Sequence, residues 1–340
     1  MKPYKYHPLE HGDFTRILLL HPATDHAAPL RCDLKHCQEQ TFSCEAVSYA
    51  WGTPIFTGTL FCDSDDEHIQ IASSLDALLR ALRKPSGTRK LWVDAVCINQ
   101  EDTDEKSRQV RAMSEIYRRA RQVIAWVGED YDDASKVLLF FTKNIEEFWR
   151  VDSMIGGFER AIYLDSDPGA IETLEKSICE TFGRRDLAAI RKIFLRPWFK
   201  RRWIIQEVAL AAKPIIRCGS TTMGFFDFAL CANIINLFYE QREGHVFDPR
   251  CMMDDHITSI LQSLAAHQDS RFPILELLHT YHAAQCSDDR DRIYALLGLS
   301  DDLVSKPDVD HAHKRRRRYT TEIPINYEDG AEQVYTTLAL

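Results

Sequence analysis

Residues 91–100, LWVDAVCINQ, constrain the fold of this chain more than any other stretch. They open with the apolar run LWV, which is typical of a strand covered on both faces. Asp94 interrupts the apolar residues, and the stretch ends in the amides Asn99 and Gln100. Residues 101–120 then have the pattern of a helix. Open α/β sheets bind ligands at the carboxyl ends of their strands. A strand that passes into a helix through an acid and two amides therefore predicts an α/β fold and marks a candidate site.

The rest of the chain extends this pattern. Strand and helix patterns alternate through residues 44–218, which predicts an α/β fold with a mainly parallel sheet and helices on both faces. The further strands are expected at 15–20, 30–34, 44–50, 122–128 and 214–218, with a hairpin at 59–71. The helices are expected from Ser73 or Ser74, and at 102–120, 132–149, 186–194, 196–212, 225–240, 256–267, 273–284, 288–299 and 328–340.

Composition narrows the class of protein. The chain has 340 residues, of which 45% are hydrophobic, so it has ample material for a core and a length typical of about two domains. A net charge of −9 argues against a nucleic-acid-binding surface. No apolar run approaches the roughly 20 residues of a membrane span, and the N-terminus lacks the apolar core of a signal peptide. These features predict a cytoplasmic protein.

The cysteines and the basic run allow limited conclusions. The ten cysteines form no CxxC pair and read as reduced thiols of an intracellular protein. Cys32 and Cys37 flank His36, but no second ligand pair follows at zinc-site spacing, so no metal is expected. The run KRRRR, which begins with Lys314 and ends with Arg318, is either a nuclear import signal or anion contact, or a solvated segment.

Familiar catalytic fingerprints are absent. The sequence contains no GxxxxGK[ST], GxGxxG, HExxH or GxSxG motif. Cys97 has no obvious histidine partner, which makes a cysteine nucleophile a weak hypothesis. A function must therefore be argued from single polar side chains in apolar surroundings.

Glu207 is the most informative of these side chains. Its neighbours one helical turn away, Trp203 among them, are apolar, and a carboxylate there is unfavourable unless it is paired or functional. Desolvation would raise its pKa, as suits a general acid or a group that grips a sugar hydroxyl. The alternative is a structural ion pair with a nearby arginine, namely Arg196, Arg201 or Arg202.

Asp94 and the neighbouring strand end leave similar alternatives. Asp94 either orients a ligand or caps the following loop through backbone amides, while Asn99 and Gln100 shape that loop. Ser48, Tyr49 and Trp51 follow an adjacent strand, where an aromatic ring either stacks on a ligand or packs in the core.

The pair Arg290 and Asp291 has the pattern of a salt bridge at the start of a helix. It is interpreted as a structural clamp.

Six blocks of the sequence together resemble a known family. In order along residues 42–300, they are similar to successive blocks of the fungal heterokaryon incompatibility (HET) domain. The resemblance implies an intracellular protein whose activation triggers cell death when incompatible strains fuse. The blocks are FSCEAVSYAWG, SSLDALLRALR, LWVDAVCINQED, QVRAMSEIYRRARQVIAWVG, RPWFKRRWIIQEVALA and SDDRDRIYALLGL.

The HET domain is also distantly similar to Toll/interleukin-1 receptor (TIR) domains, which implies a TIR-like, flavodoxin-like sheet. In enzymatic TIR domains, the glutamate of a W-C-x-x-E pattern works on NAD. Trp203 and Glu207 match that spacing, although Ile204 replaces the cysteine and an insertion at 130–185 precedes the helix. The resemblance thus implies NAD as a substrate, no tightly bound cofactor, and Glu207 as the catalytic residue. The residues expected to bind the dinucleotide are Ser48, Tyr49, Trp51, Gly52, Asp94, Asn99, Gln100 and Trp203.

The expected organisation has three parts. Residues 1–41 supply N-terminal strands that pack on the core, 42–220 form the α/β core, and 221–340 form a helical extension that ends inside a helix, as a truncated module would. The expected partners are an upstream recognition domain or protein and further copies of the chain, with no nucleic acid and no membrane. The alternative function is a non-enzymatic signalling module that acts by self-association.

Overall fold

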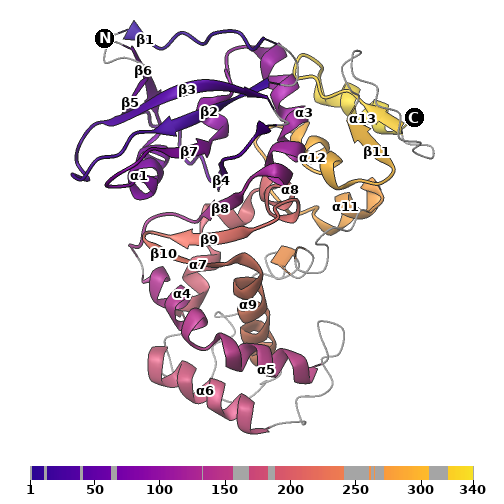
Figure 1. Cartoon of the computed structure of the whole chain (residues 1–340). Helices are drawn as coiled ribbons and strands as arrows, with labels where there is room; N and C mark the ends of the chain where they lie inside the picture. The colour runs from indigo at the N-terminus through magenta and orange to yellow at the C-terminus, as the bar shows by residue number, and fades with distance from the viewer. Residues whose placement is uncertain are drawn as a thin grey trace.

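A long mixed sheet organises the molecule (Figure 1). The computed structural model describes residues 2–10, 14–38, 41–62, 67–131, 133–155, 168–182, 188–240, 260–261, 264, 272–305 and 321–339. Within these residues the strand order is β1-β6-β5-β3-β2-β7-β4-β8-β9-β10. The strands are β1 (Lys2–Pro3), β2 (Phe14–Leu20), β3 (Leu30–Gln38), β4 (Glu45–Tyr49), β5 (Gly58–Cys62), β6 (Glu67–Ile71), β7 (Arg89–Trp92), β8 (Gln122–Trp126), β9 (Pro214–Cys218) and β10 (Thr221–Gly224).

The centre of the sheet is parallel. Strand β4 pairs in parallel with β7 on one side and with β8 on the other, and β8 pairs in parallel with β9. In chain order these four strands lie 2-1-3-4, which is the order of flavodoxin-like sheets. Strand β2 joins the centre through antiparallel pairing with β7, and β10 ends the sheet antiparallel to β9. The predicted α/β fold with a mainly parallel core is confirmed, and the N-terminal strands extend the same sheet.

Helices cover both faces of this sheet, as expected. On one face, Trp92 of β7 packs edge-on against Tyr117 of α3 (Thr103–Arg119), with ring centroids 5.6 Å apart. On the other face, Arg89 of β7 donates to the carbonyl of Leu82 at the end of α1 (Ser73–Leu82). Successive strand residues point to opposite faces, so the two helices sandwich the central strands.

The central stretch is less extended than predicted. Strand β7 ends at Trp92, and the next residues form a single helical turn, α2 (Asp94–Cys97). The main-chain carbonyl of Asp94 accepts hydrogen bonds from the amide of Ile98 and from the side chain of Gln100, at 3.1 Å each. These bonds close the turn, which stands where the sequence predicted a loop, and the strand predicted for the LWV run ends one residue earlier, at Trp92.

A group of helices follows β8 in the chain and lies below the sheet in Figure 1. The predicted helix 132–149 is broken at Asn144, whose amide donates to the carbonyl of Phe140 and ends the first segment. An aromatic cluster that includes Phe140, Phe141 and Phe228 forms its core. The helices of this group are α4 (Ala134–Lys143), α5 (Ile145–Ile155), α6 (Pro168–Phe182), α7 (Ala188–Phe194) and α9 (Phe225–Glu240). Two further segments follow β8 in the chain, η2 (Pro197–Lys200) and α8 (Trp203–Ala209), and α8 lies beside β8 in Figure 1.

The C-terminal part is largely helical, but it also contains two short parallel strands that were not predicted. Leu303 pairs with Thr321, and Ser305 with Ile323. The basic run 314–318 lies outside the described residues. The elements are α11 (Ile274–Thr280), α12 (Asp291–Tyr294), η4 (Leu297–Leu299), β11 (Leu303–Ser305), β12 (Thr321–Ile323) and α13 (Ala331–Ala339). Among the described residues, no helix has the length and apolarity needed to cross a bilayer.

Candidate functional site

The strand order places a switch point at β4. The chain passes from β4 to β7 on one side and then crosses to β8 on the other. In doubly wound sheets, ligands bind where the strand order reverses in this way, outside the carboxyl ends of the strands. Ser48 and Tyr49 end β4, and Asp94 follows β7. The candidate residues therefore converge at the place where this topology forms crevices.

Glu207 of α8 lies against this switch point and is buried, with 1% of its surface exposed. The hydroxyl of Ser48 donates a hydrogen bond to the Glu207 carboxylate and accepts one from the Trp198 indole at 2.8 Å. The Tyr117 hydroxyl also lies against the carboxylate. Burial raises the pKa of Glu207 above that of an ordinary glutamate, while Arg201 and the Ser48 hydroxyl oppose the rise.

The arginine beside Glu207 is Arg201. One of its terminal nitrogens lies 3.5 Å from the Glu207 carboxylate. Arg196 and Arg202, the other two arginines considered from the sequence, donate to main-chain carbonyls at Val127 and Tyr281 respectively. The ion pair expected as the structural alternative thus exists, through one contact and without a two-pronged clasp.

Arg201 connects the two carboxylates of the site. Burial alone would lower its pKa, but the charges of Glu207 and Asp94 raise it above the ordinary arginine value. About 21% of the Arg201 side chain is exposed. The terminal nitrogen that faces Glu207 is buried and makes no hydrogen bond, so this guanidinium acts on both carboxylates through its charge.

Asp94 makes the hydrogen bond to the following loop that one of the two alternatives from the sequence requires. Its carboxylate accepts hydrogen bonds from the Ala95 amide at 2.7 Å and from the Trp51 indole at 3.0 Å. It is 9% exposed, and burial raises its pKa while Arg201 opposes that rise. Asp94 therefore caps the loop and also faces the cation of the site.

Trp51 is the exposed neighbour of Asp94 in this site. Its side chain is 43% exposed, and its carbonyl accepts a 2.6 Å hydrogen bond from Ser74. That serine does not cap α1, which begins after Ala72 without a side-chain cap. Gly52 has φ = +71°, a conformation that glycine adopts without strain. The Trp51 ring is thus held at the surface beside Asp94.

The remaining predicted loop residues shape the backbone. The main-chain amide of Asn99 donates to the Glu105 carboxylate at 2.7 Å, and Glu105 forms a buried ion pair with Arg16. Gln100 donates to the carbonyl of Asp94. Burial raises the pKa of Tyr49, the charges of Asp94 and Glu207 raise it further, and Arg201 opposes the rise. The hydrogen bonds of Asn99 and Gln100 agree with a loop-shaping role.

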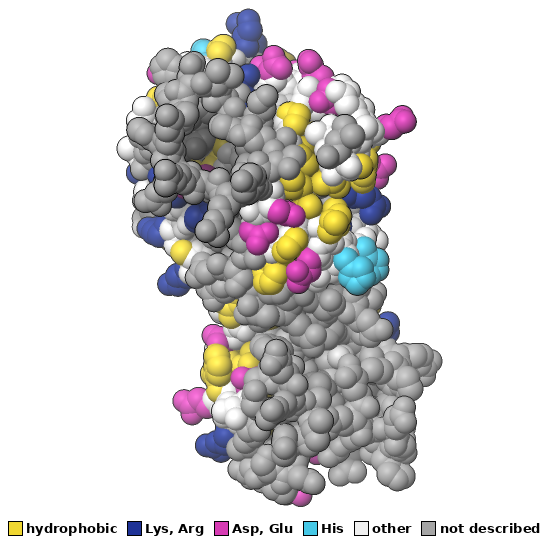
Figure 2. Space-filling model, turned by 90° about the vertical axis from the view of Figure 1, so that its right-hand side faces the viewer, with side chains coloured by type: hydrophobic (Ala, Val, Ile, Leu, Met, Phe, Trp, Pro, Cys, Tyr) yellow, Lys and Arg dark blue, Asp and Glu magenta, His cyan; other side chains and the backbone are white. Residues whose placement is uncertain are grey.

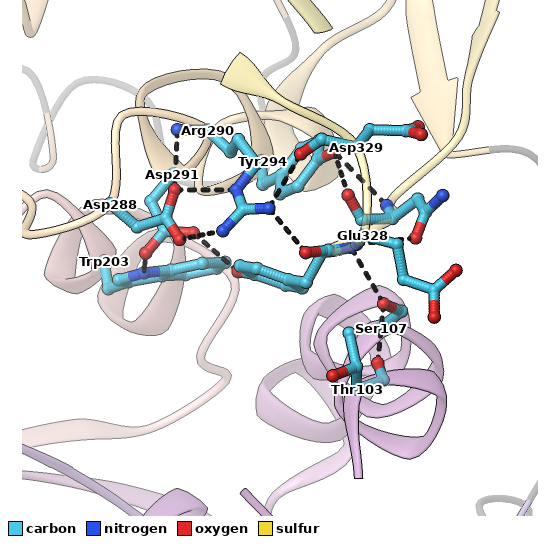
Figure 3. Close-up of polar contacts among 11 residues, drawn as sticks. Thr103, Ser107, Trp203, Asp288, Arg290, Asp291, Tyr294, Glu328 and Asp329 are labelled. Carbon is cyan, nitrogen blue, oxygen red and sulfur yellow. Dashed lines mark hydrogen bonds and ion pairs between the residues drawn. The ribbon is translucent and has the colours of Figure 1, made fainter. Parts of the chain in front are cut away.

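Trp203, one turn before Glu207, takes part in an anchor between α8 and the C-terminal part (Figure 3). Its indole donates to Asp291 at 2.9 Å, and the Tyr327 hydroxyl donates to the other oxygen of Asp291 at 2.5 Å. Arg290 is paired with Asp288 and donates to the carbonyl of Tyr327. The predicted pairing of Arg290 with Asp291 was therefore wrong, because Arg290 pairs with Asp288 while Asp291 accepts hydrogen bonds from Trp203 and Tyr327. The two residues still belong to a structural clamp, which leaves the Trp203 N–H engaged by protein.

Sequence reasoning missed Trp198 and Tyr117 as partners of the site. Tyr117 lies on the apolar stripe of α3, so its sequence position cannot be distinguished from a core position.

Burial raises the pKa of the Cys97 thiol to about 12, which disfavours the thiolate that a nucleophile needs. Within the described part of the chain, no three His, Cys, Asp or Glu side chains gather as a metal site would require.

Comparison with known proteins identifies the family. The family described as Heterokaryon incompatibility protein (HET) matches residues 44–207. The chain therefore contains a HET domain at residues 44–207. The matched HET region begins just before β4 and ends at Glu207, so it contains the whole switch point. The HET chain is also 33% identical over 228 residues to heterokaryon incompatibility protein 6, OR allele, of Neurospora crassa. That alignment covers 60% of this chain and 33% of the relative.

The chain thus spans about one third of the length of that relative. No solved structure matches it.

Proposed function

We propose that this chain is the effector module of a heterokaryon incompatibility response, and that it hydrolyses NAD in the cytoplasm with Glu207. The family match and the printed name of the Neurospora relative support the biological role. The observation that carries the chemistry is the convergence of Asp94 and Glu207 on Arg201 at the switch point. The proposed loss of NAD would cause the cell death that follows incompatible fusion.

The reaction uses the Glu207 carboxylate electrostatically. Cleavage of the bond between nicotinamide and C1′ of the ribose leaves the electron pair on the nicotinamide ring nitrogen, and a positive, oxocarbenium-like ribose forms. A carboxylate against the ribose stabilises that charge. Water then adds to C1′ and releases a proton, so NAD⁺ and water give nicotinamide, ADP-ribose and H⁺. Nicotinamide departs as a neutral base and needs little acid assistance.

Arg201 controls access to the carboxylate in this proposal. In the described state, Glu207 is buried and held by Arg201 and Ser48. The pyrophosphate of NAD carries two negative charges, and guanidinium groups bind phosphate oxygens with paired hydrogen bonds. A dinucleotide that engages the exposed part of Arg201 draws it from Glu207 and frees the carboxylate. The half-exposed Trp51 ring stacks on one of the bases.

The experiment is to incubate purified protein with NAD and follow nicotinamide release. Wild-type protein is expected to release nicotinamide, and Glu207→Gln is expected to lose at least a hundredfold in rate, as for loss of an electrostatic catalytic group. Glu146→Gln is the matched control, because Glu146 is exposed on α5 and undergoes the same chemical change. Equal release by wild type and Glu207→Gln would refute catalysis by this carboxylate.

A second candidate function is supported by the exposed surface. Trp51, Ile55 and Phe56 expose large apolar side chains in the loop after β4. Hydrophobic and acidic side chains also lie side by side on the face that carries the C-terminal elements (Figure 2). Exposed apolar side chains favour association, and the burial of Glu207 suits a structural role. The second candidate is therefore a non-enzymatic module that signals by self-association.

Light scattering and NAD turnover on the same samples distinguish the two candidates. The scaffold predicts assembly that weakens in Phe56→Ser and no nicotinamide release in any assembled sample. The enzyme predicts nicotinamide release that depends on Glu207.

A further inference from the structure

A second cavity lies away from Glu207, beside the β9–β10 hairpin. Its volume is about 550 Å³, within the range of small-molecule sites. Strands β7, β8, β9 and β10 and the junction of α4 with α5 supply its walls. Arg89 and Gln122 open β7 and β8, and Lys213 directly precedes β9. The cavity is therefore at the amino ends of the parallel strands, whereas the Glu207 site is at their carboxyl ends.

Three cations line this cavity, and they differ in how they are compensated. Arg89 is paired with Glu45 at 2.7 Å, so its charge is neutralised. Arg217 donates to the carbonyls of Gly219 and Ala81, at 2.9 and 2.7 Å, and makes no ion pair among the described residues. Neutral carbonyls orient a guanidinium without cancelling its charge. Burial and the nearby Arg89 lower the pKa of Arg217, and the charge of Glu45, the partner of Arg89, opposes this only in part.

Lys213 adds a further positive charge at the rim. It is exposed and also lacks an ion-pair partner within the described part of the chain. The single carboxylate in the lining is Asp227, in the first turn of α9, where its side chain lies against Gly224. The helix dipole offsets part of a negative charge at a helix N-terminus, so Asp227 cancels at most one of the two charges of Lys213 and Arg217. The cavity thus holds an excess of positive charge.

The other walls indicate what kind of anion fits. Ile145, Ile215 and Met223 supply apolar surface, and Gln122 and Thr222 supply amide and hydroxyl groups. A phosphate on Lys213 and Arg217, joined to a ring or chain against the apolar wall, would use both kinds of surface.

We propose that this cavity is a binding site for a phosphorylated small molecule, with Lys213 and Arg217 as the phosphate-binding residues. The site is independent of NAD hydrolysis, because none of its lining residues belongs to the Glu207 site. A chain that has lost catalysis through Glu207→Gln would still bind phosphate here.

The test is equilibrium dialysis of the purified chain with radiolabelled inorganic phosphate at low ionic strength. Wild-type protein is expected to bind phosphate saturably, and Lys213→Ala to bind it about tenfold more weakly, as for loss of one charge-assisted contact. Lys213→Arg is expected to retain binding. Lys90→Ala is the matched control, because Lys90 is also exposed but follows Arg89 on β7 and points to the opposite face.

Lys213 is the first position to change because its exposed side chain leaves the fold intact, whereas Arg217 also holds the carbonyls of Ala81 and Gly219. The proposal is overturned if Lys213→Ala binds as tightly as wild type, or if phosphate does not bind saturably at millimolar concentration.

Discussion

Replacement of Arg201 by methionine tests how the buried carboxylate of Glu207 is held. Methionine retains much of the length of the arginine side chain but removes the cation 3.5 Å from Glu207. Removal of one partner of a buried ion pair destabilises a protein by about 3–5 kcal/mol. The Ser48 hydroxyl remains as a donor and Arg201 is partly exposed, so we expect the lower end, about 3 kcal/mol near neutral pH.

The stability deficit of Arg201→Met should depend on pH in a defined direction. Without the cation, the pKa of Glu207 in the folded state rises further above its unfolded value. Between the unfolded-state pKa and the higher folded-state pKa, the folded state binds more protons than the unfolded state. The variant therefore loses stability as pH rises through this interval and recovers it as pH falls. The recovery relative to wild type is at most about 1.4 kcal/mol for each pH unit.

Denaturant unfolding followed by tryptophan fluorescence, at several pH values, measures this effect. With an unfolding entropy of about 2.1 cal/mol/K per residue, 3 kcal/mol corresponds to a Tm decrease of about 4 °C in this chain. The double variant Arg201→Met with Glu207→Gln should be more stable than Arg201→Met, because no buried charge is left unpaired. The reasoning would be contradicted if Arg201→Met were as stable as wild type at all pH values, and if the effects of the two substitutions on the free energy of unfolding simply added in the double variant.

Two further predictions concern the surroundings of the site. Gly298→Ala would place a methyl group 2.5 Å from the Gln206 side chain and 2.7 Å from Ser114, so we expect about 1–3 kcal/mol of destabilisation, measured by denaturant unfolding. A gain in stability would contradict that packing. Tyr327→Phe removes a 2.5 Å hydrogen bond to the buried Asp291 and should decrease stability by about 1.5–3 kcal/mol. An unchanged Tm in Tyr327→Phe would contradict a contribution of this hydrogen bond to stability.

The parallel core could be predicted because its strands are short apolar runs separated by helical patterns. Residues 122–128 and 214–218 each matched a strand of the structure within two residues. The stretch after Trp92 was harder, because a continuous apolar run does not distinguish a buried strand from a buried helical turn. The bonds made by Asp94 and Gln100 decide that choice, and they depend on the folded loop.

Other differences from the predicted elements have local or long-range causes. The break at Asn144 interrupts a pattern of apolar residues that continues on both sides, so periodicity alone predicted one helix. Strands β11 and β12 have three residues each and pair Leu303 with Thr321. Strands that short carry too few residues for a pattern, and their pairing depends on the tertiary fold.

The candidate site was predicted in part for a physical reason. A carboxylate in an apolar helix signals a partner, and Glu207 has one. Three arginines were near it in sequence, and only the tertiary structure brings Arg201 to Glu207 while Arg196 and Arg202 bind carbonyls elsewhere. The roles of Trp198 and Tyr117 depended on the same packing and had no sequence signal.

The pH dependence of nicotinamide release from NAD tests the central claim most directly. Catalysis needs the Glu207 carboxylate ionised, and burial raises its pKa. Release by the wild-type chain should therefore fall as pH decreases, with a midpoint above the ordinary glutamate value of 4.5, and Glu207→Gln should show no such limb. A rate that is independent of pH across that range, or an acid limb that persists unchanged in Glu207→Gln, would contradict the account.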